Sequence, residues 1–118
     1  MAVLDGLRVL DLGGSVACSV ATLVLAEAGA EVVMVEPPGG SPLRARPGFR
    51  TWGRSKTSVE VDVASDAGRR QLETLLEGAD VLMHSIRPVE AAALHLDDPS
   101  LAERFPDLIV SSILGWPI

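Results

Sequence analysis

The 118-residue sequence contains one cysteine, Cys18, and two histidines, His84 and His95. A single cysteine excludes an intrachain disulfide and favours a reducing, cytoplasmic location over a secreted one. The histidines stand apart from any cluster of cysteines or carboxylates, so the sequence offers no metal-binding motif. We interpret Cys18 as a small hydrophobic residue on a helix face, and the two histidines as packing or surface residues.

Long apolar runs are also missing. No run approaches the roughly 20 residues that a membrane-spanning helix needs, and the first residues, MAVLDGLRVLDL, are interrupted by Asp5 and Arg8. This start differs from a secretory signal. The formal net charge of −6 argues against nucleic acid as a partner, because binding to a phosphate backbone requires a basic face. We expect a single cytoplasmic domain over residues 1–118, with no membrane association.

Three nucleotide and hydrolase signatures are absent. Gly13 and Gly14 follow the first apolar run, but the next glycine is Gly29, so the G-x-G-x-x-G fingerprint of dinucleotide-binding folds is not formed. Neither the G-x-x-x-x-G-K-[ST] phosphate loop nor the G-x-S-x-G nucleophile elbow occurs. Glu36 stands where such folds often place a ribose-binding acid, a weak signal without the glycines.

The apolar pattern that is present indicates alternating strands and helices. Buried strands are predicted at 7–12, 30–36 and 79–85, a strand with one wetter face at 57–63, and a last strand at 107–113. Helices are predicted at 15–28, 65–76, 90–94 and 99–104. This order predicts an α/β fold, a Rossmann-like, doubly wound and mostly parallel sheet of about five strands with flanking helices. Ligands of such sheets bind beyond the carboxyl ends of the strands, here the Gly13–Ala17 turn, the loop after Glu36, the segment His84–Arg87 and the GWPI tail.

Residues 37–55 contain four prolines and four glycines and show no helical or strand period. Half of the ten lysines and arginines fall between positions 44 and 56, where no aspartate or glutamate occurs. One interpretation of this cationic loop is a solvated surface segment. The other is a site for a small phosphorylated or carboxylated ligand, because arginine side chains match such groups in shape and charge.

The sequence resembles the N-terminal part of the family III CoA-transferases. The similar segments, in order, are LDGLRVLDL, SVAT, LAEAGAEVVMVEPPGG, SKTSVEVDVASDAGRRQLETLLEGADVL, SIRP and DLIVSSILGW. This CaiB/BaiF superfamily includes formyl-CoA and carnitine CoA-transferases and α-methylacyl-CoA racemase. The resemblance covers essentially the whole chain in one register. It implies a Rossmann-like domain, coenzyme A or acyl-CoA as substrate, no tightly bound cofactor, and an interlocked homodimer.

The resemblance also implies a set of binding residues. In the family, the turn after the first strand receives the adenine part of CoA, and residues 15–17 match it. The lysine of the family's N-K-R-S segment matches Lys56, and its E-N-F-R-P-G segment, near the pantetheine and phosphates, matches residues 84–89. With the cationic loop as a charge partner for the phosphates, the residues expected to bind CoA are Ser15, Val16, Ala17, Arg54, Lys56, Ser85, Ile86 and Arg87.

Several positions depart from the family pattern. The glycine and proline of the first turn are replaced by Cys18 and Ser19, the basic residue after the second strand by Pro37, the asparagine by Ser85, the last glycine by Val89, and an arginine by Ala93. Such changes weaken the contact of the backbone and of cations with CoA. The alternatives are therefore a degenerate, non-catalytic structural or dimerisation module, a racemase-type relative, or a domain that binds another anionic metabolite.

The resemblance implies a reaction whose key residue lies outside this chain. In the family, an aspartate attacks acyl-CoA to form a mixed anhydride and then an enzyme–CoA thioester, and the racemases use an aspartate and a histidine. Both sets follow the position that matches Trp116, where GWPI resembles the start of the family's G-F/W-G-Q segment. We therefore expect a domain that stops before the catalytic region. We assign no catalytic residue and expect no activity from the chain alone.

Overall fold

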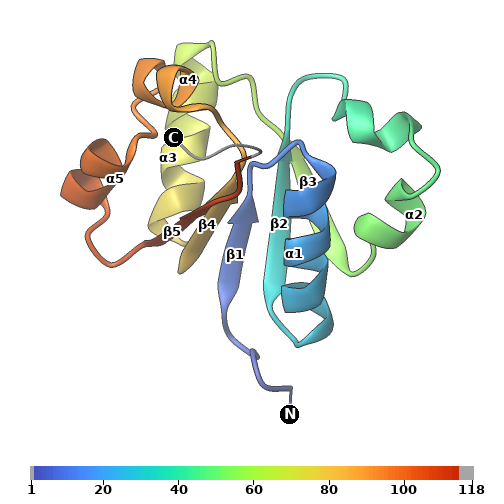
Figure 1. Ribbon diagram of the computed structural model, residues 1–118. Helices are drawn as coiled ribbons and strands as arrows, with labels where there is room; N and C mark the ends of the chain where they lie inside the picture. Colours follow the sequence, from blue (N-terminus) through green and yellow to red (C-terminus); the bar gives the residue numbers. More distant parts are fainter. Residues whose placement is uncertain (1, 115–118) are drawn as a thin grey trace.

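The computed structural model describes residues 2–114 (Figure 1), and the GWPI segment lies outside the described residues. The strands are β1 (Arg8–Asp11), β2 (Glu31–Glu36), β3 (Lys56–Glu60), β4 (Val81–His84) and β5 (Ile109–Ser112). They form one sheet in the order β3-β2-β1-β4-β5, and each neighbouring pair is parallel. The predicted α/β fold with five parallel strands is thus confirmed.

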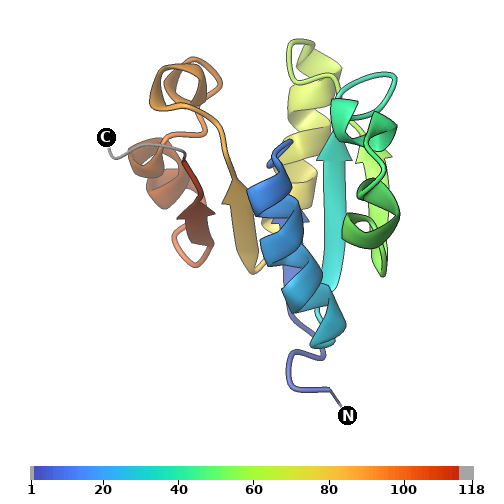
Figure 2. The same cartoon turned by 45° about the vertical axis from the view of Figure 1, so that its right-hand side comes forward.

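Helices cover both faces of this sheet. They are α1 (Val16–Glu27), the short α2 (Phe49–Trp52), α3 (Asp66–Glu77), α4 (Pro88–Ala93) and α5 (Asp98–Arg104). Figure 2 shows α1 in front of the sheet and α3 behind it. Helices on opposite faces are the mark of a doubly wound fold, because each parallel strand needs a crossover to reach its neighbour.

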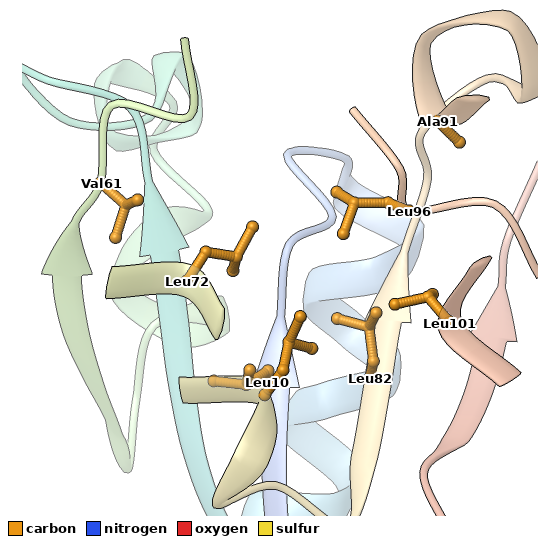
Figure 3. Close-up of a cluster of buried hydrophobic side chains, with 8 residues drawn as sticks. Leu10, Val61, Leu72, Leu82, Ala91, Leu96 and Leu101 are labelled. Carbon is orange, nitrogen blue, oxygen red and sulfur yellow. The ribbon is translucent and has the colours of Figure 1, made fainter. Parts of the chain in front are cut away.

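Two separate clusters of apolar side chains hold the layers together. The larger one lies on the α3 face, where Leu10 and Leu82 of the central strands meet Leu72, Leu96 and Leu101 (Figure 3). On the α1 face, a smaller cluster joins buried residues of β1 and β2 to the C-terminal half of α1, chiefly Val9, Val32 and Leu25. The alternation of β1 and β2 residues between two apolar faces explains why these strands read as continuous hydrophobic runs.

The helix ends follow local sequence signals. The side-chain oxygens of Ser15, Ser65 and Asp97 accept hydrogen bonds from backbone N–H groups in the first turns of α1, α3 and α5. Such caps satisfy donors that have no partner within the helix. After α1 the chain turns at Gly29, whose φ of 108° suits a residue without a side chain. The helix predicted at 99–104 thus begins at a capping aspartate, Asp97.

The connection between β2 and β3 differs from the prediction of a segment without period. It contains a 3₁₀ helix, η1 (Pro42–Ala45), and the four-residue helix α2. Ser41 caps η1 by accepting a hydrogen bond from the N–H of Leu43, whose side chain is buried. The sequence did not predict these short helices, because a single helical turn has no detectable hydrophobic period. The prolines and glycines of the segment also indicated a loop. The third strand also begins earlier and ends earlier than predicted, at Lys56 and Glu60.

Across residues 2–114, no helix combines the length and the apolar character that crossing a lipid bilayer would require.

Candidate functional site

The site lies at the carboxyl edge of the sheet, between β1 and β4. From β1 the chain turns to α1 on one face, and from β4 it continues to α4 on the other, so the two connections diverge at this point. In open α/β sheets, this divergence opens the crevice in which ligands bind. Here the two connections are joined by a hydrogen bond of 2.6 Å between the hydroxyl groups of Ser15 and Ser85.

The β1–α1 turn is held tightly against its helix. Asp11, buried at the end of β1, accepts a hydrogen bond of 2.8 Å from the N–H of Gly13 through Oδ1. A Cβ atom on Gly13 would lie only 2.3 Å from the Cβ of Cys18, so no other residue fits there without a shift. Gly14 follows with a φ of 66°, in the left-handed region that favours glycine. The turn thus requires both glycines, although they do not form a dinucleotide fingerprint.

The β4–α4 connection contributes His84 and the residues after it. His84 is buried, and its Nδ1 accepts a hydrogen bond of 3.1 Å from the N–H of Ile86, which shapes the turn. Burial lowers the pKa of His84 from its ordinary value, against the opposing effect of the Asp98 carboxylate. Arg87 lies at the surface and pairs with Glu90 at 3.4 Å. The structure therefore gives His84 a packing role, as the sequence interpretation expected.

Two of the pockets that are lined by described residues open along this edge. One, of about 90 Å³, is lined by Gly14, Glu36 and Phe49 among other residues, and lies between the β1–α1 turn and the β2–β3 connection. The other, of about 230 Å³, is lined by His84, Ile86 and residues of α5. A larger pocket, of about 310 Å³, lies at the opposite edge, around Arg8 and Gly78, where the strands begin. Its position makes it a poor candidate, because ligands of such sheets meet the ends of the strands.

Two cations of the β2–β3 connection, Arg44 and Arg54, are paired within the chain. Arg44 forms a two-point interaction with the carboxylate of Glu36, with Nε–Oε1 and Nη2–Oε2 distances of 2.9 Å. Glu36 is only 5% exposed, so this arginine neutralises a buried acid at the mouth of the smaller pocket. Arg54 pairs with Glu27, the last residue of α1, at 2.8 Å. The cationic loop is therefore less positive than its sequence suggests.

Lys56 is enclosed rather than exposed. The surface of its side chain is 0% accessible, and its ammonium group donates hydrogen bonds to Thr22 Oγ1 at 2.7 Å and to the carbonyl oxygen of Ser19 at 2.8 Å. Asp11 Oδ2 lies 3.7 Å from it. Burial lowers the pKa of Lys56 from its ordinary value, while the charge of Asp11 acts in the opposite direction.

The eight predicted residues divide into two groups. Residues 15–17 and residues 85–87 lie together at the carboxyl edge, linked by the Ser15–Ser85 hydrogen bond. Arg54 lies beside the end of α1, and β3 begins two residues after it, so it belongs to the opposite edge. Lys56 lies beneath α1, where its ammonium group contacts Asp11, Thr22 and the carbonyl oxygen of Ser19.

Sequence reasoning did not single out the buried polar residues beneath the site. In the sequence, Asp11 falls within the predicted strand 7–12 and Thr22 within the predicted helix 15–28. The one available signal was an acid within an otherwise apolar strand, since a buried carboxylate needs partners that satisfy it. Cys18 is fully buried beside Asp11, and burial together with the carboxylate raises the pKa of its thiol. It is therefore an unreactive packing residue, as predicted.

Within residues 2–114, no group of three or more histidines, cysteines or carboxylates is arranged to hold a metal ion.

The fold is a parallel α/β sheet, and its candidate ligand-binding edge is formed by the ends of β1 and β4. The chain belongs to CoA-transferase family III, which it matches over residues 4–117. It is 37% identical to the succinyl-CoA:mesaconate CoA-transferase of Haloarcula hispanica, with 98% of this chain aligned to 33% of that protein.

Solved structures of the family have the same fold. A CaiB/BaiF family protein from Brucella suis superimposes with a TM-score of 0.91 at 30% identity, over 98% of this chain and 34% of that one. The Mycobacterium tuberculosis protein Rv3272 gives a TM-score of 0.86 at 37% identity, over 95% and 33%. The chain thus spans about one third of the length of the relatives it matches, and it corresponds to an N-terminal part of the family fold.

Proposed function

We propose that this chain forms the part of a family III CoA-transferase that holds coenzyme A, or the CoA part of an acyl-CoA. The observation that carries the proposal is the meeting of two segments, residues 15–17 and 85–87, at one edge of the sheet, with the Ser15–Ser85 hydrogen bond between them. The family resemblance implies that both segments contact CoA, and the edge is the one at which doubly wound sheets bind ligands.

The chemistry of this edge suits parts of CoA. Val16 and Ala17 form the first turn of α1, where backbone N–H groups without helical partners and the helix dipole favour a phosphate. The smaller pocket, with Leu43 and Phe49 in its lining, offers apolar surface for a flat base. Arg87 lies exposed at the start of α4, within reach of solvent-borne anions, and its pair with Glu90 is at the surface and weak.

In the complete reaction, CoA moves from an acyl-CoA to a carboxylic acid through an aspartate nucleophile, and we assign no catalytic residue to this chain. CoA is then a substrate rather than a resident cofactor. The name of the succinyl-CoA:mesaconate CoA-transferase gives succinyl-CoA and mesaconate as its reactants, which favours an acyl-CoA as the substrate here. The single cysteine fits a cytoplasmic setting for such chemistry.

We also propose that the chain self-associates, as the family resemblance implies. Val20 and Val24 on the outer face of α1 are 42% and 63% exposed, and Ile109 on the edge strand β5 is 62% exposed. Apolar surface of this kind favours association. Light scattering of the purified chain between low and high micromolar concentration measures its mass, and a monomer at all concentrations would contradict the proposal.

A second candidate function, a structural module without ligand, is favoured by one observation. Arg44, Arg54 and Lys56, three of the five cations in the cationic loop region, are engaged by groups of the chain itself. Fewer charges are then available for the phosphates of CoA than the sequence suggests.

Isothermal titration calorimetry separates the two functions. The CoA proposal predicts saturable heat with CoA and a weaker response with 3′-dephospho-CoA, because the second ligand lacks one phosphate. ADP and inorganic phosphate serve as controls for general anion binding. Absence of heat with millimolar CoA would support the structural module, and equal responses to CoA, ADP and phosphate would indicate a different anionic metabolite.

A further inference from the structure

A small set of polar groups lies beneath α1, between that helix and the sheet. We call it the Asp11 network, and it consists of Asp11, Thr22, Lys56, the backbone N–H of Gly13, the carbonyl oxygen of Ser19, and the thiol of Cys18, which donates to Asp11 Oδ1 at 3.4 Å. Its members come from β1, α1, β3 and the turn after β1. Among the described residues, no buried side-chain nitrogen or oxygen lacks a hydrogen-bond partner, so the network is complete as it stands.

Lys56 is the anchor of the network. Its strand, β3, is separated from β1 by β2, so its side chain passes across β2 to come within 3.7 Å of Asp11. Two of its three donors are used by Thr22 and by the carbonyl of Ser19, and its surface is fully covered. A ligand phosphate cannot touch an ammonium group that is enclosed in this way without displacing α1.

The Asp11 carboxylate joins this anchor to the turn. Oδ2 accepts a hydrogen bond of 2.6 Å from Thr22 Oγ1, which in turn accepts one from Lys56. Oδ1 accepts the hydrogen bond of 2.8 Å from the N–H of Gly13. With Oδ2 fixed by Thr22 and Lys56, Oδ1 has one orientation, and this orientation sets the position of Gly13.

The residues that follow Gly13 form part of the carboxyl edge of the sheet. Two residues later, Ser15 caps α1 by accepting a hydrogen bond of 3.2 Å from the N–H of Cys18, and it also bonds to Ser85. The backbone of residues 13–17 is therefore held at one end by the Asp11 network and at the other by the Ser15–Ser85 contact.

We infer that Lys56 is a positioning residue of the CoA edge: it orients the Asp11 carboxylate, which holds the Gly13 amide and with it the turn that leads into α1. This inference rests on the proposed function and refines the sequence prediction for Lys56. The lysine acts through Asp11 and Thr22 and makes no contact with CoA.

The test compares Lys56→Met with the double variant Asp11→Asn/Lys56→Met. Methionine removes the ammonium group and leaves the buried carboxylate without its charge partner. In the double variant, the amide oxygen that replaces Oδ1 can still accept from Gly13, and no buried charge remains. Thr22→Val, which removes the hydroxyl group that bridges Lys56 and Asp11 but leaves their 3.7 Å ion pair in place, serves if Lys56→Met does not fold. Arg54→Met, at the opposite edge, is the matched control for loss of a cation.

The first readout needs no ligand and is amide hydrogen exchange followed by NMR. In Lys56→Met, exchange at the Gly13 amide is expected to accelerate by about tenfold relative to the amides of α3, since a buried hydrogen bond of this kind is weakened. In the double variant, the Gly13 amide returns toward its original rate. Unchanged relative exchange of Gly13 in both Lys56→Met and Thr22→Val would overturn the inference.

The second readout is the affinity for CoA and for 3′-dephospho-CoA. Because positioning affects both ligands alike, Lys56→Met is expected to weaken both by the same factor, of about tenfold, and the double variant to recover both. A larger loss for CoA than for 3′-dephospho-CoA, without recovery in the double variant, would show direct contact with the phosphate and overturn the inference. If the unchanged chain binds neither ligand, the proposed function fails, and the exchange of Gly13 alone decides whether Lys56 positions the turn.

Discussion

The two faces of the sheet bury different kinds of side chain. On the α3 face, Leu10 and Leu82 pack against leucines of α3 and α5, and this cluster is apolar throughout. On the α1 face, an apolar cluster around Val9 and Val32 gives way, toward the carboxyl edge, to the buried charges of Asp11 and Lys56. Burying an ion pair contributes little to stability compared with apolar packing of the same volume. The charged layer therefore points to a role in shaping the ligand edge, and the apolar layer to a role in stability.

The largest expected effect comes from the apolar face. Leu82→Ala, at a side chain with no exposed surface, is expected to lower the free energy of unfolding by about 2–5 kcal/mol, because it leaves a cavity in the main cluster. Urea denaturation measures the change, and Val89→Ala, at a residue that is 83% exposed, is the matched control. The folded fraction of the variant should bind CoA as before. If the folded fraction of Leu82→Ala binds CoA more weakly than the unchanged chain, the α3 face also shapes the CoA site, and the two faces do not have separate roles.

Two variants of the β1–α1 turn test the role of the α1 face in shaping the carboxyl edge. Gly13→Ala is expected to cost about 1–3 kcal/mol, because its methyl group would meet the Cβ of Cys18 and force the turn to move. Gly14→Ala meets no atom within 4 Å, and it should cost about 1 kcal/mol for its positive φ. Thermal unfolding and CoA titration of the two variants give the contrast. If Gly13→Ala and Gly14→Ala weaken CoA binding equally, the close contact between Gly13 and Cys18 does not determine the shape of the CoA site.

The dependence of stability on pH tests whether burial lowers the pKa of His84 in the folded chain. Because burial lowers its pKa in the folded chain, the unfolded chain binds more protons between that pKa and 6.5, the ordinary value. Stability is therefore complete above pH 6.5 and falls as the pH drops below it, with a slope of up to about 1.4 kcal/mol per pH unit from this one group. The variant His84→Asn, whose amide oxygen can still accept from Ile86, should have a flatter profile between pH 6.5 and 5. An identical slope in both proteins would contradict the assignment.

The smallest expected effect concerns the surface cation at the far edge. Arg54 and Glu27 are 59% and 48% exposed, so Arg54→Ala should change the free energy of unfolding by less than about 1 kcal/mol. Its place beside the last residue of α1 also predicts unchanged affinity for CoA. Denaturation and calorimetry on the same sample measure both quantities. A clear loss of CoA affinity would return Arg54 to the binding site that the sequence predicted.

The fold could be predicted from the sequence because each strand and each long helix has a recognisable pattern of apolar residues within its own segment. The apolar runs of β1 and β2, the leucine stripe of α3 and the stop at Gly29 each have a local signature, and the structure confirms them. Collinear similarity along the chain indicated the family, which the match over residues 4–117 shows. The short turns η1 and α2 left no signature, since four residues cannot display a period.

The interior of the site could not be predicted in the same way. Asp11, Thr22 and Lys56 are 11 and 34 residues apart along the chain, and only the parallel order of the strands brings them together. The charge count of the cationic loop was correct, but the partners of Arg44 and Arg54 lie in other elements. Net charge along a sequence does not show which cations the fold itself will neutralise, and here the fold engages several of them.

The most direct test of the CoA site is an NMR titration of the isotope-labelled chain with CoA, which maps the bound ligand onto the sheet. A site between the ends of β1 and β4 predicts chemical-shift changes concentrated in the amides of Gly13 to Ala17 and of Ser85 to Arg87, and little change in those around Glu27 and Arg54 at the opposite edge. Shifts centred at that opposite edge, or no shifts with millimolar CoA, would contradict a CoA site between the ends of β1 and β4.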